Sequence, residues 1–243
     1  MSKFGLIGKN IDYSFSKSYF TKKFDFEGLQ HTYQNFDINS IKDFPDIFKS
    51  TKGIKGLNVT IPYKEEVIPY LDKIDKKATK IGAVNTIRIT KKGKLIGYNT
   101  DYYGFQKSIE PYLKSQHKKA LILGTGGASK AIAYALKRLN ISYHFVSRTA
   151  SKFQTYSYNE LSETIISEHQ IIINCTPLGT FPDTNVCPQI PYDAISKEHL
   201  LYDLIYNPEE TKFLTIGKLK SATICNGHDM LELQAEKAWE IWK

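Results

Sequence analysis

Residues Ala120–Ser129, with the sequence ALILGTGGAS, join a short apolar run to a cluster of glycines. This pattern is typical of a buried strand that leads into a phosphate-binding turn. Gly124 allows a tight turn and Gly126 allows a pyrophosphate to approach the backbone, while a helix beginning near Gly127 directs free N–H groups at the anion. Because Ser129 stands where a third glycine is usual, the spacing alone is equally compatible with a plain glycine loop.

The next apolar segment, Ile141–Val146, indicates which cofactor such a turn would bind. It predicts the second strand of a βαβ unit, and it ends about 20 residues after the turn, where the adenosine ribose is recognised. Ser147, Arg148, Thr149 and Lys152 stand there in place of Asp or Glu. A guanidinium beside hydroxyls suits a 2′-phosphate, whereas a carboxylate suits the free 2′-hydroxyl of NAD. The sequence therefore favours NADP over NAD.

Length and composition favour a protein of two domains, and they also favour a cytoplasmic location. The chain has 243 residues, of which 41% are hydrophobic, enough for two cores. No apolar run approaches the roughly 18 residues that span a membrane, and the start, MSKFGLIGKN, is too quickly polar for a secretory signal. Cys175, Cys187 and Cys225 lack the paired spacing of a zinc site or disulfide framework, in agreement with a reducing compartment.

The net charge of +8 concerns the class of ligand. The lysines are scattered, without the arginine-rich or aromatic-interleaved stripe of a nucleic-acid-binding protein, so no nucleic-acid partner is expected. A positive field attracts anions such as a phosphate-rich cofactor or a carboxylate substrate, although a lysine-rich solvated surface requires no ligand.

Two hydroxyls, Ser14 and Ser16, lie just before a helical pattern near the N-terminus, after an expected strand at Lys3–Gly8. Serine is a good N-cap residue, and one serine is enough for that role. The pair therefore indicates a second function, the binding of a carboxylate near a helix N-terminus.

The stretch Gly56–Lys64, GLNVTIPYK, predicts a strand that ends in hydrogen-bonding side chains. Strand alternation places Asn58 and Thr60 on one face, at the end where open α/β sheets bind ligands. Pro62 suits the first turn of a following helix, in which Lys64 would oppose the helix dipole. A lysine against the local rule favours a functional role, and an ordinary exposed lysine is the alternative.

Further polar candidates follow later in the chain. A β-hairpin is expected over residues 83–99, with Asn85 early in its first strand, and Asp101 would cap the next helix. The closing helix carries Gln234 on its apolar face. An unpaired buried amide costs about 1–3 kcal/mol, so the Gln234 side chain is expected to bond either a ligand hydroxyl or a backbone carbonyl.

The order of expected strands and helices predicts a two-domain α/β protein. Residues 1–101 form a mostly parallel α/β domain for substrate binding and catalysis, and residues 102–226 a Rossmann-like NADP-binding domain with later strands at 171–174, 200–204 and 221–225. Residues 227–243 form a C-terminal helix that packs back on the first domain.

Taken in order, these motifs resemble the shikimate dehydrogenase family over nearly the whole chain. The resemblance rests on the serine pair and on NVTIPYK (58–64), GAVNT (82–86), NTDYYGF (99–105), GTGGAS (124–129), SRT (147–149), NCTPLGT (174–180), DLIYNP (203–208) and NGHDMLELQ (226–234). The chain departs from the family at Tyr13, where His is usual, at Lys17, where Pro is common, and at Ser147, where Asn usually precedes the arginine.

The resemblance implies reversible, NADP-linked interconversion of 3-dehydroshikimate and shikimate in aromatic amino-acid biosynthesis, without a metal, by a monomer or homodimer. It implies Lys64 and Asp101 as the catalytic pair. It implies these substrate-binding residues: Ser14, Ser16, Asn58, Thr60, Asn85, Tyr206 and Gln234. It implies these NADP-binding residues: Gly124, Thr125, Gly126, Gly127, Ala128, Ser147, Arg148, Thr149, Lys152, Ile205, Gly227 and Met230. A broader quinate/shikimate dehydrogenase, a methylene-tetrahydrofolate dehydrogenase, a relative that binds without turnover and a basic nucleic-acid-binding protein remain as alternatives.

Overall fold

The computed structural model describes residues 1–12, 14–148 and 155–243, which fold as two compact units. The first unit contains residues 1–100 and 235–243, and the second contains residues 101–234. The predicted two-domain α/β class is confirmed, with a mostly parallel first sheet and a Rossmann-like second sheet. The expected C-terminal segment 227–243 is divided between the units, because helix α8 (His228–Trp242) begins in the second unit and ends in the first.

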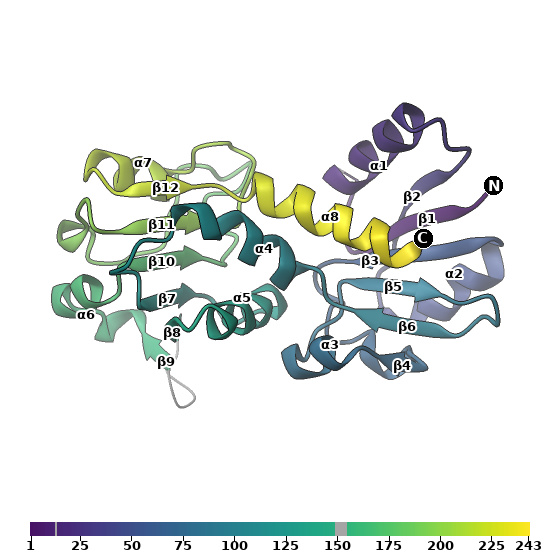
Figure 1. Ribbon diagram of the computed structural model, residues 1–243, viewed down its shortest axis with the longest axis horizontal. Coiled ribbons are helices and arrows are strands. Elements are labelled where there is room, and N and C mark those ends of the chain that lie inside the picture. The colour runs from purple at the N-terminus through teal and green to yellow at the C-terminus, as the bar shows by residue number, and fades with distance from the viewer. Residues whose placement is uncertain (13, 149–154) are drawn as a thin grey trace. The chain divides into compact units, whose positions relative to one another are not determined.

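The first unit is built on a sheet of six described strands, drawn from purple to blue in Figure 1. Among them, β5 alone runs antiparallel to its neighbours. The strands, in sheet order, are β2 (Thr32–Asp37), β1 (Lys3–Gly8), β3 (Ile54–Val59), β5 (Thr86–Ile89), β6 (Leu95–Tyr98) and β4 (Lys73–Ile74). The helices are α1 (Phe15–Phe26), α2 (Phe44–Ser50) and α3 (Lys76–Ile81), with short 3-10 turns at Ile41–Asp43 and Ile68–Tyr70.

Both faces of the first sheet are buried. On one face Leu57 of β3 packs in a cluster with Phe44 of α2, and on the other Phe4 of β1 packs with α1 and the end of α8. The indole N–H of Trp242 donates to the carbonyl of Ile87 at 3.0 Å. A Cβ at Gly56 would lie 2.3 Å from that indole nitrogen, so only glycine lets the end of α8 approach the sheet this closely.

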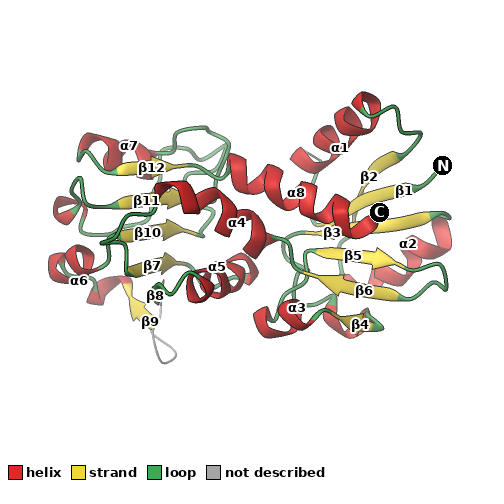
Figure 2. Ribbon diagram, viewed as in Figure 1, coloured by secondary structure: helices red, strands yellow, loops and turns green. Residues whose placement is uncertain are grey.

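The second unit is built on six described strands that all run parallel (Figure 2). In sheet order they are β12 (Thr223–Cys225), β11 (Leu200–Asp203), β10 (Ile171–Asn174), β7 (Lys119–Leu123), β8 (Ser142–Ser147) and β9 (Thr155–Ser157). The helices, besides the start of α8, are α4 (Asp101–Ile109), α5 (Gly127–Arg138), α6 (Glu163–Glu168) and α7 (Lys212–Leu219), with 3-10 turns at Glu110–Tyr112, Tyr158–Glu160 and Tyr192–Ala194. The strand order reverses between β7 and β10, which is the switch point at which dinucleotide-binding sheets hold their ligand.

The strands β7, β10 and β11 of the second sheet are largely apolar and buried on both faces. Leu121 and Ile172 pack in one cluster with Phe213 of α7, whereas the Tyr202 ring contacts Phe105 of α4. Parallel strands covered on both faces read as continuous hydrophobic runs, which explains why the sequence KALIL, IIIN and LLYD shows no alternation.

One local prediction differs from the structure, and one short edge strand was not predicted. The helix expected from Pro62 does not form over residues 61–67, which the structure describes as turns. The carbonyl of Lys64 accepts the backbone N–H of Val84 at 2.7 Å, and the N–H of Ile68 bonds Glu65 instead of Lys64. The edge strand β9 was missed, because three residues are too few for a visible period.

Candidate active site and cofactor-binding site

The serine pair lies at the start of α1, in the first unit. Ser14 is the N-cap residue, but its side chain makes no capping hydrogen bond within the described chain. Ser16 lies in the first turn and is buried. The Ser14 side chain therefore does not cap the helix, and its hydroxyl is a candidate for ligand binding.

Asn58 ends up buried near the carboxyl end of β3, where it is held by a residue that sequence reasoning missed. The hydroxyl of Tyr33, on β2, donates to Asn58 Oδ1 at 2.8 Å. The Ser16 side chain makes a further hydrogen bond with the Tyr33 hydroxyl, and burial raises the pKa of Tyr33 far above its usual range, so it stays protonated. Tyr33 thus connects two of the predicted substrate-binding residues.

The amide nitrogen of Asn58 is also occupied, which fixes the orientation of its side chain. It donates to the carbonyl of Asn85 and to Thr86 Oγ1, both at 3.3 Å. An amide nitrogen has two protons, so the remaining hydrogen-bonding capacity of Asn58 is the second lone pair of Oδ1. Asn58 is therefore arranged to accept a hydrogen bond from a ligand hydroxyl.

Asn85 lies directly before β5 and is buried in the same polar network. Its Oδ1 accepts the backbone N–H of Thr100 at 2.7 Å, and its Nδ2 donates to Thr100 Oγ1 at 3.0 Å. Buried amides with several hydrogen bonds hold a single geometry, because each lost hydrogen bond in a low-dielectric site is costly. The network of Tyr33, Asn58, Asn85, Thr86 and Thr100 is therefore a rigid polar layer.

The proposed catalytic pair comes from different parts of the chain. Lys64 is half-buried in the turns after β3, in the first unit, and Thr60 precedes these turns with its N–H bonded to the carbonyl of Ile7. Asp101 is buried and is the first residue of α4, in the second unit. Their joint action is a prediction.

Gln234 is buried on α8, as the apolar pattern of the helix predicts. Its Nε2 donates to the carbonyl of Leu231 at 2.9 Å, so a backbone carbonyl is one of its partners. Met230, one turn earlier, is also buried. A Cβ at Gly104 would lie 2.4 Å from the Met230 carbonyl oxygen, so Gly104 lets α4 pack directly on this part of α8.

The glycine turn has the geometry that an anion site requires. Gly124 has a φ of +107°, and a Cβ there would lie 3.2 Å from Thr176 Cγ2. Gly126 is the N-cap of α5, and a Cβ there would meet no atom of the described chain within 4 Å. The space beside Gly126 and the N–H groups of the first turn of α5 fit a pyrophosphate. Ser129, in place of the third glycine, is buried and donates to the Gly126 carbonyl at 2.6 Å.

The residues expected at the ribose and adenine lie at the end of β8. Ser147 is half-buried at the last position of the strand, and Arg148 is exposed directly after it. An exposed guanidinium beside the dinucleotide turn fits a 2′-phosphate. Thr149 and Lys152, and Tyr13 in the first unit, lie outside the described residues.

The carboxyl ends of β10 and β11 carry two buried polar residues that sequence reasoning did not select. Asn174 Nδ2 donates to Asp203 Oδ1 at 3.1 Å, and the N–H of Ile205 donates to the same oxygen at 3.0 Å. The N–H of Gly227 donates to the Ile205 carbonyl at 3.0 Å, which brings these two predicted cofactor-binding residues together. The sequence signal for these two residues is that each ends an otherwise apolar strand, IIIN and LLYD.

Tyr206 follows Ile205 in the same loop. It is half-buried, whereas Ile205 itself is buried. The structure thus places Ile205, Tyr206 and Gly227 at one edge of the second sheet.

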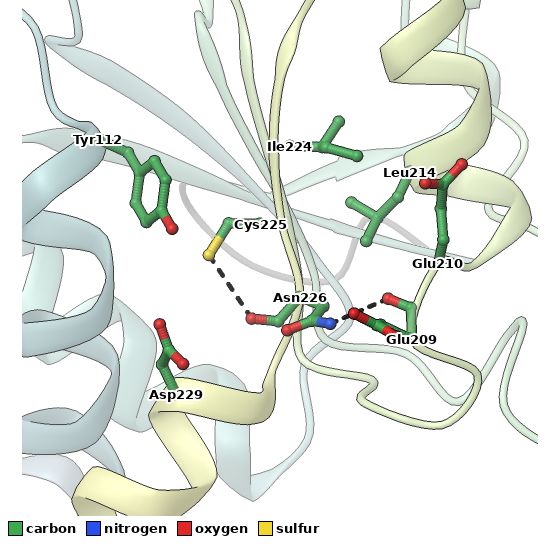
Figure 3. Close-up of a pocket in the computed structure, with 8 residues that line it drawn as sticks. All are labelled: Tyr112, Glu209, Glu210, Leu214, Ile224, Cys225, Asn226 and Asp229. Atoms are coloured by element: carbon green, nitrogen blue, oxygen red, sulfur yellow. Dashed lines mark hydrogen bonds between the residues drawn. The ribbon is translucent and has the colours of Figure 1, made fainter.

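A pocket of about 490 Å³ lies elsewhere in the second unit (Figure 3). It is lined by Tyr112, Glu209, Glu210, Leu214, Ile224, Cys225, Asn226 and Asp229. Three of these side chains are carboxylates, which repel phosphate groups. Burial raises the pKa of the Cys225 thiol to about 12, so it is protonated at neutral pH. The pocket therefore suits neither a pyrophosphate nor a nucleophilic role for its cysteine.

In residues 1–12, 14–148 and 155–243, no three His, Cys, Asp or Glu side chains are grouped as metal ligands. In the same ranges no helix is long and apolar enough to cross a bilayer.

Comparison with known proteins connects this geometry to a family. Residues 6–87 match the shikimate dehydrogenase substrate binding domain. The chain is 39% identical to the shikimate dehydrogenase (NADP(+)) of Methanosphaera stadtmanae, over 98% of this chain and 90% of that protein. The chain belongs to the shikimate dehydrogenase family. The resemblance seen in the sequence motifs is thereby confirmed.

Solved shikimate dehydrogenases are similar to the chain over its whole length. Shikimate dehydrogenase 1 from Peptoclostridium difficile is 40% identical, with a TM-score of 0.87, over 100% of this chain and 91% of that one. Shikimate 5-dehydrogenase from Thermus thermophilus, solved with NADP(H) and shikimate, is 29% identical, with a TM-score of 0.88, over 100% of this chain and 94% of that one. The family's two-domain fold is therefore that of this chain.

Proposed function

We propose that this protein catalyses the NADPH-dependent, reversible reduction of 3-dehydroshikimate to shikimate in aromatic amino-acid biosynthesis. The observation that carries the proposal is the sequence identity of 39% to NADP-linked shikimate dehydrogenases over nearly the full length of the chain. The glycine turn and the buried polar layer of the first unit support it, because they supply an anion site and hydrogen-bonding groups for a polyhydroxylated acid.

The cofactor would be held by the second unit. The backbone of Gly124–Ala128 would bind the pyrophosphate, and Arg148, with Ser147, Thr149 and Lys152, would bind the 2′-phosphate. Ile205, Gly227 and Met230 would line the nicotinamide side. NADPH, when bound, supplies the reducing equivalent for the C3 ketone.

The residues of the first unit would hold the substrate. Ser14 and Ser16 would donate hydrogen bonds to its carboxylate, and Asn58 would accept one from a ring hydroxyl, because its amide protons are already used. Thr60 and Asn85, together with Tyr206 and Gln234, would bind the remaining oxygens.

Proton transfer would be the work of Lys64. The carbonyl oxygen at C3 must gain a proton as the ketone is reduced, so an acid must lie within hydrogen-bonding distance of it. The Lys64 ammonium would donate that proton, and Asp101 would orient the ammonium. Lys64 therefore acts as the general acid in the direction of ketone reduction.

The decisive assay is loss of NADPH absorbance with 3-dehydroshikimate. Turnover supports the proposal, and equal or faster oxidation of quinate would instead identify a broader quinate/shikimate dehydrogenase. Thermal stabilisation by both ligands without turnover would identify a relative that only binds them. The cytoplasmic location and the monomeric or homodimeric state remain predictions, which cell fractionation and light scattering would check.

A further inference from the structure

Asn174 and Asp203 form a buried pair at the ligand-binding edge of the second sheet. They are the last residues of the neighbouring strands β10 and β11, directly opposite each other in register. Both are fully buried, and the Asn174 amide donates to the Asp203 carboxylate. We call this pair the strand-end clamp, and none of the expected site residues belongs to it.

Asp203 holds the loop that follows its own strand at two points. The N–H of Ile205 donates to Oδ1 at 3.0 Å, and the hydroxyl of Thr211, the N-cap of α7, donates to Oδ2 at 2.6 Å. The other side of Ile205 is bonded through its carbonyl to Gly227. A Cβ at Gly227 would lie 2.1 Å from the carbonyl oxygen of Leu204, so this backbone has no room to shift toward α8.

Asn174 does the same for the loop after β10. Its Oδ1 accepts the N–H of Thr176 at 3.0 Å and the Thr176 hydroxyl at 2.6 Å, and its Nδ2 also donates to the carbonyl of Leu178 at 3.3 Å. This loop passes the glycine turn, since a Cβ at Gly124 would lie 3.3 Å from the carbonyl oxygen of Cys175. The clamp therefore fixes the backbone of the loops after β10 and β11, on one side of the switch point.

The ionised carboxylate of Asp203 does not stabilise the folded protein. Its three hydrogen-bond donors are an amide, a backbone N–H and a hydroxyl, all neutral. Burial raises the pKa of Asp203 to about 6, although these hydrogen bonds act in the opposite direction. The titratable groups that face it are the Cys175 thiol and the Tyr192 phenol, whose pKa values burial also raises. A buried carboxylate without a cation costs free energy, so its presence requires another explanation.

We propose that Asp203 is a positioning residue for the dinucleotide: through the strand-end clamp it holds Ile205 and Thr176 in the backbone conformation that binds the nicotinamide half of NADPH. This inference rests on the proposed function for the identity of the ligand. Asp203 acts through the backbone of Ile205 and through Asn174, so its substitution should alter cofactor affinity more than it alters folding.

The test is NADPH affinity, measured by fluorescence titration of Asp203→Asn and of the wild type from pH 5 to pH 8. At pH 7.5 the variant should bind NADPH roughly tenfold more weakly, because small misplacements of binding groups have effects of this order or more. The difference should close as the pH falls below about 6, where the wild-type carboxyl also becomes neutral. The comparison is a difference between variants because the 2′-phosphate of NADPH titrates in the same range.

Two further variants separate positioning from general destabilisation. Thr211→Val removes the hydrogen bond that stabilises the charged carboxylate, so the acid limb of NADPH affinity should move to higher pH. Tyr202→Phe is the matched control: it lies on the same strand, and it loses one buried hydrogen bond, to Ser108, outside the clamp. It should bind NADPH as the wild type does at every pH.

The outcomes distinguish this inference from the proposed function. If both Asp203→Asn and Thr211→Val bind NADPH with wild-type affinity and wild-type pH dependence, the positioning role is overturned. It is also overturned if Tyr202→Phe loses as much NADPH affinity as Asp203→Asn. If Asp203→Asn does not fold, Thr211→Val alone decides. If the wild-type protein binds NADPH but does not reduce 3-dehydroshikimate, the proposed function is overturned. The NADPH affinities of the variants still test the positioning role of Asp203, because they do not depend on turnover.

Discussion

Tyr33→Phe is the substitution that tests the polar layer of the first unit. It removes one oxygen and leaves the ring, which stacks on Phe20 with centroids 4.7 Å apart. The lost oxygen donates to Asn58 Oδ1 at 2.8 Å and makes a hydrogen bond with Ser16. Because Asn58 and Ser16 are proposed to bind the substrate, loosening them should weaken substrate binding and leave NADPH binding unchanged.

The size of the effect follows from the hydrogen bonds involved. A buried hydrogen bond contributes about 1 kcal/mol, so the loss of two should lower the free energy of unfolding by about 1–3 kcal/mol. If each of the two substrate contacts weakens by about 0.5–1 kcal/mol, KM for 3-dehydroshikimate should rise roughly 5- to 30-fold. The kcat should stay within about threefold of wild type, because Lys64 is untouched.

The assay is steady-state kinetics with 3-dehydroshikimate and NADPH varied in turn, together with urea unfolding. Tyr202→Phe again serves as the control, because it loses a buried tyrosine hydroxyl, bonded to Ser108 at 2.6 Å, in the second unit. A Tyr33→Phe enzyme that is less stable but has an unchanged KM for 3-dehydroshikimate would refute the reasoning, since Tyr33 would then be only structural.

Three other substitutions give further tests. Lys64→Ala should lower kcat by about 10²–10⁴ with NADPH affinity intact, as expected for a positioned acid; near-wild-type kcat in steady-state assays would remove Lys64 from the mechanism. Arg148→Ala should weaken NADPH far more than NADH in parallel titrations, because only NADPH carries the 2′-phosphate; an equal loss for both would contradict this. Gly56→Ala should lower the free energy of unfolding by about 1–3 kcal/mol, because the new Cβ would overlap the indole of Trp242; an unchanged urea midpoint would show that the indole moves aside without cost.

The architecture could be predicted because its signals are local. The strands β7, β10 and β11 of the second sheet are largely apolar runs that lead into glycine or end in polar residues, and ALILGTGGAS marks the crossing from strand to helix. The strand β9, with three residues, and β4, with two, fall below the length at which a period can be read.

The contacts of the polar layer could not be predicted, although Asn58 and Asn85 are predicted individually, because its members are distant in sequence. Tyr33 and Asn58 are 25 residues apart and meet only when β2 and β3 take their places in the sheet. In the sequence TYQNFD, Tyr33 looks like an ordinary strand residue, since aromatic side chains are common in strands. Its hydroxyl acquires a role only through a partner that topology supplies.

The structure removes the local argument that was made for Lys64, but it supports the functional prediction on other grounds. The sequence argument placed Lys64 in a helix against the dipole, but residues 61–67 are turns, and the Lys64 carbonyl is used by Val84. Without a helix there is no dipole for the ammonium to oppose, so that reason for a special role disappears. What remains is the position of Lys64 in the turns that follow β3, six residues beyond Asn58, in a segment that matches the family's substrate-binding domain. Open α/β sheets bind ligands beyond the carboxyl ends of their strands. Lys64 is half-buried in the turns that follow the carboxyl end of β3, so it is well placed to reach a ligand bound at that end of the sheet. The case for Lys64 therefore rests on its place in the sheet, and the kcat of Lys64→Ala measures it directly.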